Sequence, residues 1–371
     1  MTDAKEALMK DSLSAPSRKE VIQTHKKAGK PVAAILPYHY PRPLLAAFDI
    51  LPVEVWGPPG IDTSFGAAHL QPYICSIVRN ALAFLLSGGL DDTDLILVPH
   101  GCDSLQGLGS ILMDFIHPKQ KVLPYYIPRG GEADDVFFLA AETRSLYNKI
   151  KDMTGLTPDE DRIRESVRQH REANLLLSQL HGSRQNMRLT QLELYRLLRS
   201  REYLPASTFS DLAREALGSK MEESQSQGIP ILLSGIVPEP MDLIEELSRM
   251  GAFVAVDDLA CCGRRIYPPS SHEDIYMAMA DSILSSPPDS TRGSPVEDRI
   301  RHLLNLAESS GAKGVIFLEI KFCEPELFYL PLLRQELNKS GIPSLVLEIE
   351  LNDPFTHQLR TRIEAFLEMI A

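Results

Sequence analysis

The sequence predicts an α/β protein with two doubly wound parallel-sheet lobes, of the Rossmann or flavodoxin kind, joined by a helical region. Short apolar runs rich in β-branched residues alternate with longer amphipathic segments in two separate blocks of the chain. Strand, helix and strand with short links is typical of open α/β domains. Between the blocks the strand signals stop, and apolar residues recur at helical spacing instead.

Eight apolar runs are the candidate strands, because they are uninterrupted, as in strands buried on both faces of a parallel sheet. The segments between them have helical patterns. Met241–Met250, for example, is followed by Gly251, which suits a helix C-cap. The candidate strands are Val32–Leu36, Val53–Trp56, Leu95–Val98 and Val122–Tyr126 in the first block, and Ile229–Ser234, Ala252–Val256, Gly314–Leu318 and Ser344–Glu348 in the second.

We expect an N-terminal α/β lobe with a leading helix over residues 1–131, a helical connecting or cap region over 132–227, and a C-terminal α/β lobe over 228–371. Pro158 and Pro205 are expected to break the helices of the middle region. In the C-terminal lobe, the stretch Ser285–Ser290 (SSPPDS) predicts an exposed loop.

Composition narrows the function classes. The 371 residues carry a net charge of −12, which argues against a nucleic-acid or membrane-surface binder, and 44% of them are hydrophobic, which suffices for more than one core. The start, Met1–Glu6, has no apolar signal core, and no apolar run is long enough to span a membrane. Five cysteines without regular spacing do not predict a disulfide framework. We therefore expect a cytoplasmic protein.

Three of the cysteines share one position, at the point where a strand-like run gives way to a helix: Cys75, Cys102 and Cys323. Helix N-termini stabilise thiolates, and ligands of open parallel sheets bind beyond the carboxyl ends of the strands. Two of these cysteines come from the first lobe and one from the second, so they would meet between the lobes. Three thiolates would hold a metal centre and leave its fourth position free.

A lone free cysteine more often packs as a small core residue, and Cys261 and Cys262 fit that interpretation because they follow an apolar run. If the other three do bind metal, soft thiolate ligands select an iron–sulfur cluster, zinc or copper(I). Zinc is weakly indicated, because the sequence has no Cys-x-x-Cys pair. An iron–sulfur cluster would give the site redox chemistry.

The segments around the three cysteines are Gln71–Ser76 (QPYICS), Pro99–Leu105 (PHGCDSL) and Lys321–Glu326 (KFCEPE). They resemble segments of the 2-hydroxyacyl-CoA dehydratase and benzoyl-CoA reductase family, including the D-component type of 2-hydroxyglutaryl-CoA dehydratase. The resemblance spans most of the chain apart from the helical middle. It extends to Ala255–Asp258 (AVDD), Gly263–Arg264, Gly314–Phe317, Pro331–Arg334, Gly341–Pro343 and Gln358–Phe366.

The resemblance implies a [4Fe–4S] cluster held by Cys75, Cys102 and Cys323, a heterodimer with a related second subunit, and a separate ATP-dependent iron–sulfur activator. It implies a lyase that removes water from a 2-hydroxyacyl-CoA after one electron converts the thioester carbonyl into a ketyl radical. The chain has no Gly-x-x-x-x-Gly-Lys-Ser/Thr loop, which is consistent with ATP hydrolysis in the activator. A subunit of a benzoyl-CoA-reductase-type enzyme and a non-catalytic cluster or electron-relay partner are the alternatives.

Weaker signals point to further site residues. Arg264 and Arg265 would bind the phosphates of coenzyme A through guanidinium forks, or else form a solvated surface pair. His100 would supply a proton or a supporting hydrogen bond to the substrate site, with a structural role as the alternative. Glu319 and Glu324, on either side of the last cysteine, are candidate acid–base groups, with helix capping as the alternative.

Overall fold

The computed structural model describes residues 15–219 and 228–371, which form two four-stranded, all-parallel sheets flanked by helices. This confirms the predicted fold class. The first sheet, in the order β2-β1-β3-β4, consists of β1 (Val32–Ile35), β2 (Leu51–Glu54), β3 (Leu95–His100) and β4 (Lys121–Tyr126). The second, in the order β6-β5-β7-β8, consists of β5 (Ile229–Gly235), β6 (Ala252–Leu259), β7 (Gly314–Ile320) and β8 (Ser344–Ile349).

The two sheets have the same topology. In each, the chain moves from the first strand to an edge strand and then returns to the other side of the first strand. The switch point therefore lies between β1 and β3 in one sheet and between β5 and β7 in the other. In sheets of this kind ligands bind beyond the carboxyl ends of the strands beside the switch point.

All eight strands overlap their predicted runs but differ at one or both ends, and two of the differences are informative. β2 begins at Leu51 and contains Pro52, which is tolerated because β2 is an edge strand of its sheet. β6 continues past Val256 to Leu259 and so includes two buried aspartates, Asp257 and Asp258. Both aspartates form ion pairs with buried arginines, so their charges are compensated in the interior.

Four described α-helices separate the two sheets along the chain. The first lobe contains α2 (Arg18–Lys27), α3 (Arg42–Ala47), α4 (Ser76–Leu86) and α5 (Asp103–Ile111), and the middle region contains α6 (Asp135–Thr154), α7 (Glu160–Ser183), α8 (Gln191–Ser200) and α9 (Ala206–Gly218). The C-terminal part contains α10 (Asp242–Arg249), α11 (Ile275–Leu284), α12 (Val296–Ser310), α13 (Glu324–Lys339) and α14 (His357–Ile370). None of the described helices is long and apolar enough to cross a membrane.

The predicted helix breaks are confirmed. Pro158 lies between α6 and α7, and Pro205 is the N-cap of α9. Gly251 has a positive φ of 78° directly after the end of α10, as the sequence predicted for a C-cap. The end of the predicted middle region, residues 220–227, lies outside the described residues, and the boundaries at 131 and 227 stay a prediction.

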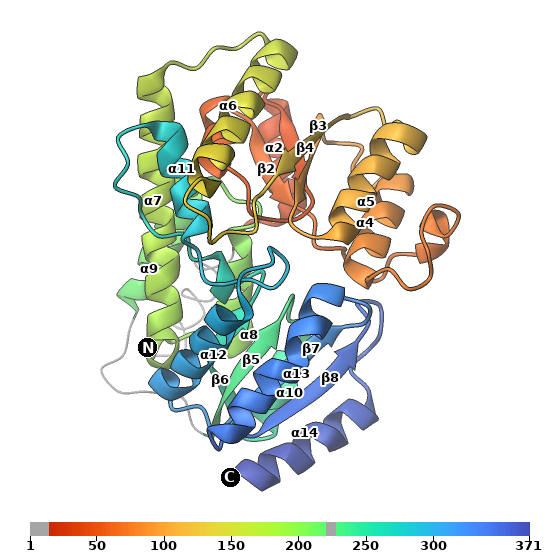
Figure 1. Cartoon of the computed structure of the whole chain (residues 1–371), viewed down its shortest axis with the longest axis vertical. Coiled ribbons are helices and arrows are strands. Elements are labelled where there is room, and N and C mark those ends of the chain that lie inside the picture. Colours follow the sequence, from red (N-terminus) through yellow and green to blue (C-terminus); the bar gives the residue numbers. More distant parts are fainter. Residues whose placement is uncertain (1–14, 220–227) are drawn as a thin grey trace, which may run out of the picture.

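The cores of the two lobes are joined. One large hydrophobic cluster contains Ala34 and Ile96 of the first sheet together with Ile231 and Ile316 of the second. The opposite face of the first sheet packs against a second cluster that includes α11, which comes from the C-terminal part of the chain. Figure 1 shows α11 beside α6 and α7, whereas α4 and α5 lie on the other side of the first sheet.

Candidate metal centre

Each of the three cysteines singled out by the sequence is the N-cap residue of a helix: Cys75 of α4, Cys102 of α5 and Cys323 of α13. Two of these helices follow a strand directly, since β3 ends at His100 and β7 at Ile320. Cys75 and Cys323 are buried, and Cys102 is partly exposed. The predicted position at strand-to-helix junctions is thus observed for Cys102 and Cys323, and all three thiols lie at helix N-termini.

The two lobes meet beside Cys75. The backbone N–H of Leu351, just after β8, donates to Ser76 Oγ at 3.4 Å, and Asn80 Nδ2 donates to Asn352 Oδ1 at 2.9 Å. α4 of the first lobe is therefore held against the strand ends of the second. In Figure 1 α4 and α5 lie together beside the first sheet, above the upper end of the second lobe.

The three thiols act on one another electrostatically. Burial raises the pKa of all of them, that of Cys102 to about 12. The charge of Cys75 raises the pKa of Cys102 further, and the charges of Cys75 and Cys102 both raise the pKa of Cys323. Coulombic effects of this kind fall off with distance, so these shifts favour a common site for the three thiols, and their convergence on one cluster stays a prediction.

A single metal ion and a cluster make different demands on the donor set. No three His, Cys, Asp or Glu side chains in the described part of the chain are placed around one metal ion. In a cubane each cysteine binds its own iron atom, so its ligands need to share a cavity rather than a point. Backbone amides in the first turn of each helix lower the thiol pKa values against the effect of burial, as they would for thiolates bound to a cationic centre.

A buried polar network includes Glu326, in the first turn of the helix that Cys323 caps. Arg264 Nη1 donates to Glu326 Oε1 at 2.7 Å and to Asp289 Oδ2 at 3.4 Å, and the Tyr38 hydroxyl of the first lobe donates to the same Asp289 oxygen. The charge of Glu326 in turn raises the pKa of Cys323. The network therefore connects both lobes to the helix that carries this thiol.

This network corrects one prediction. The stretch Ser285–Ser290 is not an exposed loop, because Ser286, Asp289 and Ser290 are buried. Asp289 turns this segment inward, since its carboxylate also accepts a hydrogen bond from the backbone N–H of Thr291 at 2.7 Å. Serine and proline composition indicated a loop correctly, but did not show that its aspartate pairs with a buried arginine.

Arg264 and Arg265 have carboxylate partners in this structure. Both are buried, so the alternative of a solvated surface pair is wrong. Arg264 pairs with Glu326, and Arg265 pairs with Glu54 at the end of β2. A phosphate would have to compete with these carboxylates, and the binding of coenzyme A by the two arginines stays a prediction.

The family model described as 2-hydroxyglutaryl-CoA dehydratase, D-component, matches residues 37–370, which is most of the chain. The chain belongs to this family. The beta subunit of (R)-phenyllactyl-CoA dehydratase from Clostridium sporogenes is 22% identical to it over 367 residues, covering 97% of both chains. The beta subunit of (R)-2-hydroxyglutaryl-CoA dehydratase from Acidaminococcus fermentans is 24% identical, covering 95% of this chain and 96% of the relative. A benzoyl-CoA reductase subunit from Thauera aromatica is also 24% identical, with coverages of 91% and 90%.

The resemblance predicted from the sequence is thus confirmed at the level of the D-component family. The family match does not assign roles to single residues. His100, at the end of β3, is half-buried, and burial lowers its pKa. Its ring lies 4.7 Å from that of Tyr126, and neither ring nitrogen has a hydrogen-bond partner among the described residues. Its role toward substrate stays a prediction.

Two further buried residues of this D-component chain have strongly shifted pKa values. Burial and the charge of Glu326 raise the pKa of Glu319, at the end of β7, to about 8. Burial lowers the pKa of His39 to about 3, and its Nε2 has no hydrogen-bond partner in the described part of the chain. The sequence pointed to Glu319 but missed His39, whose only signal was its place just after the first predicted strand.

Cys261 and Cys262 follow β6 and are buried in the large core cluster. Their sulfur atoms lie 3.5 Å apart, which is a contact between thiols. Packing with apolar neighbours agrees with the interpretation of these two as core residues.

Proposed function

We propose that this chain is the iron–sulfur subunit of a 2-hydroxyacyl-CoA dehydratase, a lyase of the cytoplasm, with one [4Fe–4S] cluster held by Cys75, Cys102 and Cys323. The observation that supports the proposal is that three cysteines from both lobes cap helix N-termini, and that the charge of Cys75 raises the pKa of Cys102 while the charges of both raise the pKa of Cys323. Membership of a family known for iron–sulfur clusters supports the choice of cofactor.

When bound, such a cluster would supply a one-electron carrier and, at an iron atom without a protein ligand, a Lewis acid. The chain itself would orient the substrate between the lobes and exclude water from it. Glu319 keeps a proton on its carboxyl group up to about pH 8 and so would serve as a general acid or hydrogen-bond donor at neutral pH. Its Oε2 atom has no hydrogen-bond partner in the described part of the chain, which leaves it free for that task.

A second, related subunit would complete the enzyme, and a separate ATP-dependent activator would supply the electron. Large apolar side chains are exposed on two of the segments that carry the cysteines: Tyr73 is 61% exposed and Phe328 is 75% exposed. Exposed aromatic residues of this kind are typical of protein interfaces. The curated relatives are themselves named as subunits.

Reduction of an aromatic acyl-CoA is the second candidate function, because the benzoyl-CoA reductase subunit is as similar to this chain as a dehydratase subunit is. The complete assembly, with its partner subunit, activator and ATP, would be given a 2-hydroxyacyl-CoA or an aryl-CoA. Turnover of the first alone supports the dehydratase, and turnover of the second alone supports the reductase. If the chain binds the cluster but the assembly turns over neither substrate, the electron-relay role is the remaining candidate.

The cluster itself is tested by metal content. Chain reconstituted without oxygen should contain about four iron and four sulfide ions. Cys75→Ser, Cys102→Ser and Cys323→Ser should each lose most of the iron, because serine replaces the soft donor. They should keep the fold, because serine is itself a good N-cap.

Cys261→Ser and Cys262→Ser are matched controls, since they remove a thiol from the same chain without touching the proposed site. Both should retain the iron of the wild type. Full iron content in Cys323→Ser would contradict the ligand assignment, and so would an equal loss in the two controls.

A further inference from the structure

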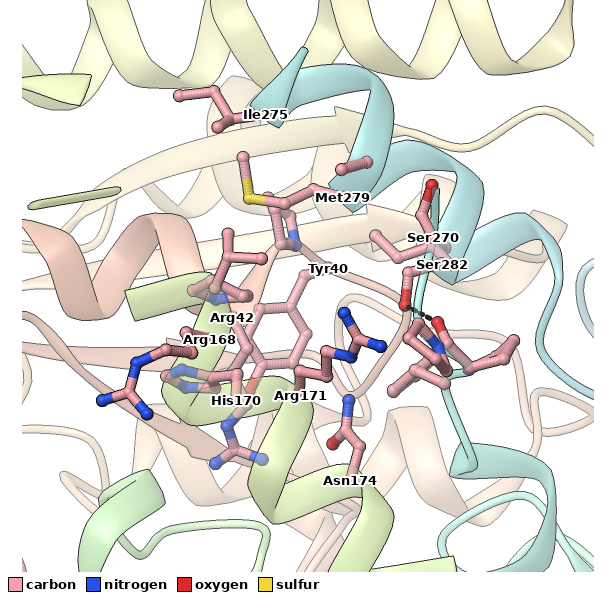
Figure 2. Close-up of a pocket in the computed structure, with 18 of the residues that line it drawn as sticks. Tyr40, Arg42, Arg168, His170, Arg171, Asn174, Ser270, Ile275, Met279 and Ser282 are labelled. Carbon is pink, nitrogen blue, oxygen red and sulfur yellow. Dashed lines mark hydrogen bonds between the residues drawn. The ribbon is translucent and has the colours of Figure 1, made fainter. Parts of the chain in front are cut away.

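A cavity of about 300 Å³ is lined by residues of α3, α7 and α11, by the end of β2 and by the segment after β6. No cysteine lines it, so it is separate from the proposed metal centre. Its apolar walls include Tyr40 and Met279, which Figure 2 shows on either side of the opening between the helices. Its charged lining consists of Arg42, Arg164, Arg168, Arg171, Arg201 and Arg265, against the carboxylates of Glu54 and Glu273.

The buried part of this lining has more positive than negative charge. Arg42, Arg201 and Arg265 are 7%, 3% and 4% exposed, and Glu54 is the buried carboxylate among them. Arg42 and Arg265 both pair with Glu54, whereas Arg201 has no ion-pair partner among the described residues. Two of the three buried guanidinium groups thus share one carboxylate, and the third has none.

Arg201 is the unusual member of this group. Its Nε and Nη1 atoms have no hydrogen-bond acceptor among the described residues, and its guanidinium carbon lies 5.7 Å from the centre of the Phe209 ring. Burial, together with the charges of Arg42 and Arg265, holds its pKa well below the usual value for arginine. A buried, unpaired charge is costly to the folded chain unless an anion joins it.

The neighbouring arginines also have unused donors. Arg42 Nε and Nη2 and Arg265 Nε lack acceptors, which makes five such nitrogen atoms with the two of Arg201. Arg171 is exposed and has no ion-pair partner in the described part of the chain, and Figure 2 shows its guanidinium group beside Tyr40. Arg164 and Arg168 are already paired, with Glu160 and Glu165.

We propose that this cavity binds a phosphate group, either free or at the end of a larger ester, with Arg42, Arg171 and Arg201 as its ligands. A phosphate carries up to two negative charges, which matches the surplus charge of the buried lining, and its several oxygens suit the planar donor groups of arginine. A carboxylate offers one charge and two oxygens. The volume of about 300 Å³ holds a phosphate with a small attached group, so a larger ester would leave the rest of its body outside.

Calorimetric titration of the full chain tests the proposal with three probes: inorganic phosphate, coenzyme A and succinate, all at one ionic strength. Phosphate or coenzyme A should bind, and Arg201→Met and Arg171→Met should each weaken that binding at least tenfold, which corresponds to about 1.4 kcal/mol. Arg162→Met is the matched control, because this residue of α7 is paired with Asp49 and does not line the cavity. It should leave the affinity within twofold of the wild type.

Thermal denaturation shows whether a loss of phosphate binding is caused by a folding defect. Arg201→Met removes an unpaired buried charge, so its melting temperature without phosphate should equal or exceed that of the wild type. Added phosphate should raise the melting temperature of the wild type but not that of this variant. Because the cysteines are outside the cavity, the iron content of all these variants should be unchanged.

The probes separate the two sources of phosphate. If coenzyme A competes with phosphate and its binding depends on Arg201, the ligand is a phosphate ester. If inorganic phosphate binds and coenzyme A does not, the ligand is free phosphate. Both results support the proposal. It is overturned if neither probe binds the wild type, if both arginine variants bind as the wild type does, or if succinate binds as tightly as phosphate with the same dependence on Arg201.

Discussion

At the scale of single residues, one buried carboxylate connects the two lobes. Glu54 accepts hydrogen bonds from Tyr40 at 3.1 Å and from Trp56 Nε1 at 3.1 Å, and it pairs with Arg42 and Arg265. Arg265 comes from the segment after β6, so this ion pair crosses between the lobes. Removing one member of such a group leaves the others charged, buried and unpaired.

Glu54→Leu should therefore lower the free energy of unfolding by roughly 3–5 kcal/mol, as for other broken buried ion pairs. Urea denaturation followed by circular dichroism measures this change. The double variant Glu54→Leu/Arg265→Met should recover part of the loss, because the abandoned charge is removed as well. A Glu54→Leu protein as stable as the wild type would show that the group contributes nothing to the folded state.

At the scale of elements, the connection from β2 to α4 fixes the position of Cys75. Gly57 has a positive φ of 70°, and a Cβ atom placed on it would lie 2.5 Å from the carbonyl oxygen of Ile77. Ile77 belongs to the first turn of α4, directly after the N-cap cysteine. The loop therefore approaches the helix start so closely that only glycine fits without a shift of the backbone.

Gly57→Ala should push the start of α4 away from this loop, and so lower both the stability and the iron content of the reconstituted chain. Gly60→Ala is the matched control: Gly60 has a φ of 75°, but no atom lies within 4 Å of a Cβ placed there. The control should lose only the cost of the left-handed backbone, about 1–2 kcal/mol. Denaturation and iron analysis of both variants check this, and equal effects would mean that the contact with Ile77 is unimportant.

Some features of the helices and strands were predictable from the sequence, and others were not. The strands were predictable because each is an uninterrupted apolar run, and the N-terminal positions of the cysteines followed from the order of strand and helix. The end of β6 was not predictable, because Asp257 looks polar in the sequence and only its partner Arg184 makes it a buried strand residue. The same holds for Asp289 and Arg264, whose pairing depends on contacts between distant segments.

At the scale of the whole molecule, the buried interior contains histidines as well as ion pairs. His39 and His170 are buried and His181 is largely buried, and burial is the largest cause that lowers their pKa values. The values for His39 and His181 are about 3 and about 4. Below pH 6.5 the unfolded chain takes up protons that these rings refuse in the folded chain, so acid favours unfolding.

The free energy of unfolding should thus fall between pH 7 and pH 5, on the order of 2 kcal/mol for each of these histidines. In His39→Asn the free energy of unfolding should fall less over this pH range, by about the contribution of one histidine. Asparagine tolerates the positive φ of 63° at this position. His357→Asn, at an exposed site on α14, should leave the pH dependence unchanged. Urea denaturation at several pH values decides the matter, and a pH profile of His39→Asn identical to that of the wild type would contradict it.

The placement of α11 has a consequence for how the protein is made. Its side chains Ile275, Met279 and Ile283 share a core with Ile35 and Leu97 of the first sheet, although they are encoded far behind that sheet. A ribosome therefore releases the whole N-terminal lobe before the helix that covers one face of it exists. During that interval the nascent chain exposes an apolar sheet face, the kind of surface that chaperones bind and that aggregates when left alone.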